Sequence, residues 1–123
     1  MKTLLILATI ATLSALAQAS DVPELRCFGT EPFWGLSTDS FGTLSMDDPA
    51  TEGSQIYSKA TIKNALGTAD GLAFQIEAKN KFKKSIKLNV VKSECSDGMS
   101  EEVYPYTVLV DVNNGVLFGC CRK

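Results

Sequence analysis

The chain has 123 residues, of which 12 are basic and 14 are acidic, so its formal net charge is −2, and it contains no histidine. A chain of this length forms one domain, and the mildly acidic balance argues against general nucleic-acid binding. The lack of histidine removes the commonest general base and the commonest metal ligand.

The first 19 residues have the pattern of a secretory signal peptide. Lys2 precedes the apolar run LLILATIATLSAL, and Ala17-Gln18-Ala19 forms an A-x-A cleavage site. This run is shorter than the roughly 20 residues of a membrane-spanning helix. We therefore predict export, a periplasmic or secreted product, and a single domain over residues 20–123. No cysteine stands at or beside the cut, so no acylated membrane anchor is expected.

The segment RCFGTEPFWG, residues 26–35, follows the predicted cleavage site. Pro32 fixes its own φ and pushes Glu31 toward extended geometry, which predicts that residues 29–32 form a turn or loop before a strand that starts near Phe33. Trp34, the only tryptophan, is interpreted mainly as an anchor at one end of the core. The alternative is that its ring stacks on a planar ligand such as a sugar.

Glu31 stands beside these aromatic residues in the sequence, where we expect its carboxylate to be partly desolvated. Arginine flanks the cysteines near both ends of the mature chain, as Arg26 beside Cys27 and Arg122 beside Cys121. We expect a structural ion pair between Glu31 and Arg122 rather than a catalytic acid, because ion pairs perturb carboxylates without any chemistry.

The dominant period of apolar residues in the mature chain is two, which is typical of half-buried strands. The segments LAFQIEA, SIKLNVV and YTVLVDV each place one apolar set on one face: Leu72, Phe74, Ile76 and Ala78; Ile86, Leu88 and Val90; and Tyr106, Val108, Val110 and Val112. Other strands are expected over residues 34–38, 42–46 and 55–63. Asn113-Asn114-Gly115 predicts a tight hairpin turn before VLFGCC. These elements predict an all-β domain, a small antiparallel barrel or sandwich of about seven to eight strands.

All four cysteines, Cys27, Cys95, Cys120 and Cys121, lie in the mature part of the chain. Neighbouring residues on a strand point to opposite faces, so Cys120 and Cys121 should each bond to a distant partner. We predict that one of them joins Cys27 and the other joins Cys95, and the sequence leaves both crossed forms open. Two structural disulfides are favoured over a redox dithiol or a zinc site, because the chain has no C-x-x-C and exported thiols become oxidised.

Three segments, CFGTEPFW, CSDGMSEEVYPY and GCCR, occur in that order. Together they resemble a functionally uncharacterised group of bacterial envelope proteins, often lipoproteins, with C-x-G-x-E-P-F-W, C-x-D-x-M-S and G-C-C-R motifs. The resemblance implies an envelope location and a cysteine framework but no mechanism. Residues from about 38 to 92 contribute nothing to it, and this chain departs from the lipoprotein members in lacking the acylated cysteine.

The segment CSDGMSEE is a second candidate site. It offers oxygen ligands to a hard cation, namely Ser96, Asp97, Ser100, Glu101 and Glu102. Their spacing is not that of a calcium loop, D-x-D-x-D-G, so no metal is predicted. A capped turn with Met99 packed inward is the favoured interpretation, because Asp and Ser form such turns locally.

A basic run surrounds Phe82 and consists of Lys79, Lys81, Lys83 and Lys84. It would suit an anionic polymer of the envelope. The favoured interpretation is a solvated hairpin connection, because strand edges and turns commonly carry lysine.

No enzyme, cofactor or metal is predicted, because the chain lacks G-x-S-x-G, a Gly-rich phosphate loop and H-E-x-x-H. The leading hypothesis is a monomeric, non-catalytic binding or inhibitor module of the cell envelope, with a protein or a glycan as partner. Lysozyme inhibition is one form of it, although the chain has no Ser-Gly-x-x-Tyr loop. The candidate binding residues are Glu31, Trp34, Asp97, Ser100 and Arg122. A structural or stress-related envelope protein is the alternative, and a hydrolase that uses Glu31 with Asp97 or Glu101 ranks below both.

Overall fold

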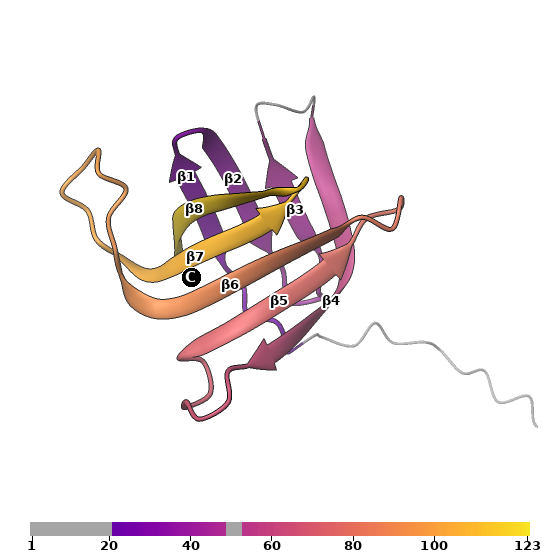
Figure 1. Ribbon diagram of the computed structural model, residues 1–123, viewed down its shortest axis with the longest axis horizontal. Helices are drawn as coiled ribbons and strands as arrows, with labels where there is room; N and C mark the ends of the chain where they lie inside the picture. Colours follow the sequence, from indigo (N-terminus) through magenta and orange to yellow (C-terminus); the bar gives the residue numbers. More distant parts are fainter. Residues whose placement is uncertain (1–20, 49–52) are drawn as a thin grey trace, which may run out of the picture.

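The computed structural model describes residues 21–48 and 53–123, which form a closed antiparallel barrel (Figure 1). Its strands are β1 (Arg26–Thr30), β2 (Phe33–Thr38), β3 (Leu44–Asp47), β4 (Ser54–Asn64), β5 (Ala73–Lys79), β6 (Ser85–Cys95), β7 (Tyr104–Val112) and β8 (Gly115–Arg122). Each strand pairs with its neighbours in sequence order, and β8 returns to pair with β1. The all-β prediction is confirmed, and the architecture is a barrel. The predicted signal peptide, residues 1–19, lies outside the described residues.

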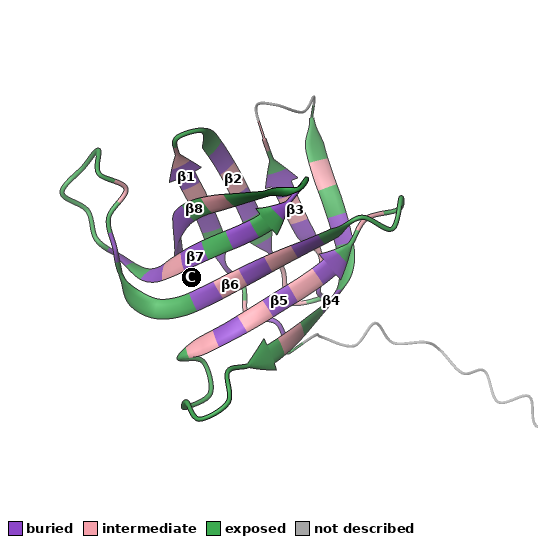
Figure 2. Ribbon diagram, viewed as in Figure 1, coloured by how far each residue is buried: buried purple, intermediate pink, exposed green. Residues whose placement is uncertain are grey.

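The alternation of apolar and polar residues explains the barrel, because it gives every strand one face for the interior. Buried residues alternate with more exposed ones along β5, β6 and β7 (Figure 2). Several interior side chains are completely buried, namely Leu44, Ile76, Ile86, Leu88, Val108 and Val110. The interior is therefore filled by side chains rather than open.

The strand predictions are correct for the middle of the chain but incomplete for its start. The hairpin turn between β7 and β8 is confirmed, with positive φ at both Asn113 and Asn114. Leu72, which was expected on the buried face, lies just before β5 and is 43% exposed. β1 was not predicted as a strand, and the turn expected near Gly29 lies instead between β1 and β2.

The two disulfides are Cys27–Cys121 and Cys95–Cys120. This confirms that each of the adjacent cysteines has a distant partner, and it settles which of the two crossed forms occurs. Cys121 belongs to the main core, whereas Cys120 belongs to a second buried cluster with Cys95 and Tyr104. The first bridge therefore lies inside the barrel and the second lies outside it, as the alternation of side chains along a strand requires.

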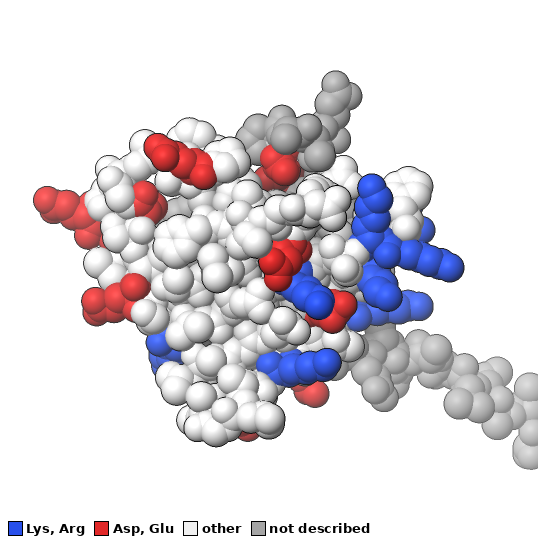
Figure 3. Space-filling view, in the orientation of Figure 1, with Lys and Arg blue, Asp and Glu red and all other residues white. Residues whose placement is uncertain are grey.

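Each side of the visible face is dominated by charged side chains of one sign, while both signs occur near its centre (Figure 3). Lysine and arginine gather at the right of Figure 3, over the connection between β5 and β6, and acidic side chains gather at the left, near the connection between β6 and β7. In the part of the chain that is described, no helix has the length and hydropathy required to cross a membrane.

Candidate functional site

The three motifs that are separated in the sequence line a single groove on the outer side of the barrel. The groove has a volume of about 380 Å³ and lies between the end of β1, β8 and the start of the connection that follows β6. Its walls are formed by Phe28, Gly29, Thr30, Glu31, Ser96, Asp97, Gly98, Met99, Phe118, Gly119 and Cys120. Each motif thus contributes to the walls, and Phe118, which directly precedes GCCR, completes them.

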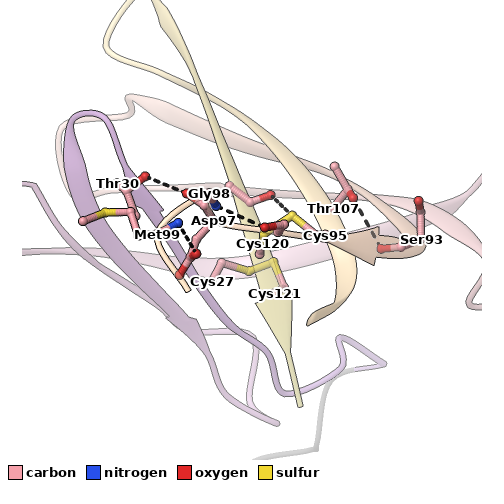
Figure 4. The surroundings of a disulfide bond; sticks show 12 residues. Cys27, Thr30, Ser93, Cys95, Asp97, Gly98, Met99, Thr107, Cys120 and Cys121 are labelled. Atoms are coloured by element: carbon pink, nitrogen blue, oxygen red, sulfur yellow. Dashed lines mark hydrogen bonds between the residues drawn. A yellow bond between two sulfur atoms is a disulfide. The ribbon is translucent and has the colours of Figure 1, made fainter. Parts of the chain in front are cut away.

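The outer disulfide holds this connection, residues 96–103, against the barrel (Figure 4). Cys95 ends β6, and its bond to Cys120 fixes the beginning of the connection to β8. On the other side of the groove, the Thr30 hydroxyl donates a hydrogen bond to the backbone carbonyl of Asp97, at 3.4 Å. The connection is therefore tied to both strands that form the groove.

Asp97 organises the turn within this connection. Its Oδ1 atom accepts hydrogen bonds from the backbone N–H groups of Met99, at 2.8 Å, and Ser100, at 3.1 Å. The Ser96 hydroxyl accepts another from the N–H of Gly98, whose φ is 75°. The capped turn predicted for this segment is confirmed. The N–H groups of Met99 and Ser100 lower the pKa of Asp97, so its carboxylate stays ionised in mildly acidic solution.

Acidification is expected to loosen this turn only at low pH. Because the pKa of Asp97 is lowered in the folded chain, the stabilisation by its carboxylate is complete above the unfolded pKa of about 3.9 and is lost as the pH falls through the folded value. In an NMR titration, the amide signals of Met99 and Ser100 should move with a midpoint below about 3.9. Asp97→Asn keeps the acceptor oxygen and should abolish this titration. A midpoint above that value would contradict the assignment.

The groove combines apolar walls with two acidic side chains. Met99 is 70% exposed and Phe118 is 59% exposed, while Glu31 lies at the turn after β1 and Asp97 lies across from it. Large exposed apolar side chains beside carboxylates suit a ligand that has both an aliphatic part and a positive charge. The favoured inward packing of Met99 was therefore wrong, because the Asp97 turn directs this side chain outward.

A small aromatic cluster supports the groove from behind. The rings of Phe28 and Tyr104 meet edge to face with centroids 4.7 Å apart, next to the Cys95–Cys120 bridge. The Tyr104 hydroxyl donates a hydrogen bond to the Glu102 carboxylate, at 3.0 Å. Burial raises the pKa of Tyr104, and this hydrogen bond raises it further. The base of the connection is thus fixed by packing and by a polar contact.

Trp34 lies beneath the groove and not in its wall. It is 5% exposed and belongs to the main core, in agreement with the anchor interpretation. Its indole packs directly against the backbone of Gly29 and Gly119, and a Cβ atom added at either glycine would collide with the ring. These two glycines line the groove, so the floor of the groove is backbone that rests on Trp34.

The predicted ion pair between Glu31 and Arg122 is wrong. Arg122 on β8 is the backbone register partner of Arg26, which is at the start of β1. Glu31 instead follows the end of β1. Five residues of extended chain separate the two sites by roughly 16 Å. Arg122 instead lines a different hollow, together with Glu24 and Asp39.

The structure therefore brings together two of the five predicted binding residues, Glu31 and Asp97. The Ser100 hydroxyl is used inside the connection, where it accepts a hydrogen bond from the N–H of Glu102. Phe118 was missed, although it lies in VLFGCC beside the cysteines.

Among the described residues, no group of three or more Cys, Asp or Glu side chains is arranged to hold a metal ion.

Comparisons of the chain with protein-family models, with curated proteins and with solved structures found no match.

Proposed function

We propose that this chain is an exported, non-catalytic binding or inhibitor module of the bacterial cell envelope, and that it takes a basic, partly apolar segment of a protein into the groove. The observation that carries this proposal is the convergence of three separate motifs on one outer groove. Two disulfides supply the rigidity that a preorganised binding surface needs.

The packed interior favours binding on the outside of the barrel. Barrels that carry small ligands enclose a cavity for them. Here the inward side chains of β5, β6 and β7 fill the centre, and most of them are fully buried. A ligand therefore meets the protein at its surface, and the groove offers exposed apolar side chains next to ionised carboxylate.

The charge of the groove favours a basic protein segment over a glycan. A lysine or arginine side chain can place its aliphatic stem against Met99 and Phe118 and its charge near Asp97 and Glu31. A neutral sugar gains less from carboxylates and binds best on an exposed flat ring, whereas Trp34 is buried.

The state of Asp97 supports a non-catalytic role. A carboxylic acid that protonates a leaving group needs a raised pKa. The pKa of Asp97 is lowered, and one of its oxygens already accepts two backbone hydrogen bonds. This carboxylate is suited to hold a turn and attract a cation, which disfavours a hydrolase that relies on it as the acid.

Photo-crosslinking tests the proposal. A photoreactive phenylalanine at position 118 should give a discrete adduct with an envelope protein, whereas one at position 41, on an equally exposed phenylalanine outside the groove, should not. The double variant Glu31→Gln/Asp97→Asn should weaken binding of the captured protein roughly tenfold, as expected from two partly exposed ion pairs. The matched control is Glu24→Gln/Asp70→Asn, which removes two exposed acidic charges elsewhere.

A lysozyme-inhibition assay is the direct test of the inhibitor form, with the same two double variants. Adducts of equal strength at positions 118 and 41 would overturn the groove as the binding site. No adduct and no inhibition would leave the structural envelope protein as the better explanation. Turnover of a glycan substrate that is lost in Glu31→Gln/Asp97→Asn would instead establish the hydrolase.

A further inference from the structure

The connection between β5 and β6 is a rigid, protruding tip. It extends beyond the body of the barrel in Figure 1. The Asn80 Oδ1 atom accepts hydrogen bonds from the backbone N–H groups of Phe82, at 2.9 Å, and Lys84, at 3.0 Å. The backbone of Asn80 also pairs with Lys84 and accepts from Lys83. The backbone of this tip is therefore held in place by several hydrogen bonds.

Phe82 is placed at this tip with 69% of its surface exposed. The Lys81 ammonium lies 5.1 Å from the centroid of its ring. A single exposed phenylalanine is ordinary on a protein surface. A phenylalanine at a fixed tip that is flanked by lysine on both sides is a pattern that suits an amphipathic boundary.

Lys83 adopts a backbone conformation that residues other than glycine and asparagine rarely adopt. Its φ is 62°, in the left-handed region where glycine or asparagine is favoured. A glycine would form the same turn with less strain. The position instead carries a long cationic side chain directly after Phe82 in the sequence.

The positive charge extends from the tip onto the neighbouring surface. Lys83, Lys84 and Lys87 line a hollow of about 660 Å³ between this tip and the β7–β8 turn, and among the described residues Asp111 is the one acidic side chain of its lining. Lys79 and Lys81 precede Phe82 in the sequence and add two further positive charges to this region. The acidic side chains near the groove gather at the opposite side of the molecule (Figure 3).

We propose that this tip docks the protein onto an anionic phospholipid surface, with Phe82 inserted at the headgroup boundary and the lysines against phosphate groups. A soluble polyanion would pair with the lysines but leave the ring in water, whereas a bilayer surface receives both. The acidic groove then faces away from the lipid and stays open to its partner. This site is separate from the groove, so either one can fail without the other.

Flotation with large unilamellar vesicles tests the docking, using the full-length gene product exported and purified from the host. At low salt, the protein should bind vesicles with about 30% phosphatidylglycerol at least tenfold better than pure phosphatidylcholine, because anionic lipid attracts each lysine near its surface. Salt of about 0.5 M should remove most of this binding, because screening at this ionic strength limits the range of electrostatic attraction to a few ångströms.

Two matched pairs of variants separate the ring from the charge. Phe82→Ser should weaken vesicle binding several-fold, whereas Phe41→Ser, an equally exposed phenylalanine between β2 and β3 at the other end of the barrel, should leave it unchanged. Lys83→Gly should weaken it about fivefold by removing one surface charge while relieving the strained turn. Lys123→Gly removes one charge outside the tip and should have little effect.

Phe82→Trp adds a direct signal, because its fluorescence should shift to the blue on anionic vesicles while a Phe41→Trp variant should not respond. Equal binding to neutral and anionic vesicles, or none to either, would overturn the proposal. So would unchanged vesicle binding in Phe82→Ser. Competition by a soluble polyanion with equal affinity for the native chain and Phe82→Ser would assign the lysines to a polymer instead.

Discussion

Replacing Cys27 and Cys121 together by alanine is expected to lower the free energy of unfolding by about 4 to 5 kcal/mol. The two cysteines are 94 positions apart in the chain, so their bond removes a large loop-closure entropy from the unfolded state. Small domains have total stabilities of roughly 5 to 15 kcal/mol. This one bond is therefore expected to contribute a major share of the stability of the barrel.

The position of this bond adds a local consequence. The seam between β1 and β8 is the shortest ladder of the barrel and pairs only Arg26 with Arg122, Cys27 with Cys121, and Phe28 with Cys120. The Cys27–Cys121 bond sits in the middle of that ladder. Without it, the barrel should open first between these two strands, and the backbone amides of β1 and β8 should exchange with solvent faster than those of β6 and β7.

The matched control is the second bridge, which closes a separation of 25 residues. Cys95→Ala/Cys120→Ala should cost about 3.5 kcal/mol by the same reasoning, and its exchange should rise in residues 96–103 rather than at the seam. Urea unfolding gives the two free energies, and hydrogen exchange locates the opening. Equal losses with identical exchange patterns would contradict the inside and outside placement of the bridges.

The middle of the barrel could be predicted because its signals are local. Apolar residues at alternate positions, such as Ile76, Leu88 and Val108, indicate a strand with one buried face. Asn113 and Asn114 indicate the tight turn that they form. β1 was missed because Gly29 suggested a turn. Gly29 is required for another reason, because the side chain of Trp34, on the next strand, occupies the space that a Cβ atom would need.

The groove could be predicted only in part, because its walls meet through long-range contacts. The sequence pointed to Glu31 and Asp97 separately, and these residues do lie in one groove. The Cys95–Cys120 bond holds Asp97 near Glu31, and the sequence alone did not determine that cysteine pairing. The predicted ion pair between Glu31 and Arg122 was wrong because both residues are near a bridged cysteine in the sequence, but β1 carries Glu31 away from Cys27.

Gly29→Ala is expected to lower the free energy of unfolding by about 3 kcal/mol, at the upper end of the usual cost of overpacking. An added Cβ atom would collide with the Trp34 indole nitrogen and would lie 2.7 Å from the carbonyl oxygen of Phe118. The control is Gly35→Ala, on β2, where no atom of residues 21–48 or 53–123 lies within 4 Å of the added atom. That variant should change the stability by less than about 0.5 kcal/mol.

A double-mutant cycle tests whether Trp34 is the cause. Trp34→Phe removes the indole atoms nearest to the added methyl group of Gly29→Ala, so the double variant should lose at least about 1 kcal/mol less than the sum of the single variants. In Gly119→Ala, the added atom would collide first with the backbone carbonyl of Phe28, so Trp34→Phe should rescue this variant poorly. Equal rescue of both, or additive losses in both, would mean that the indole does not support the floor of the groove.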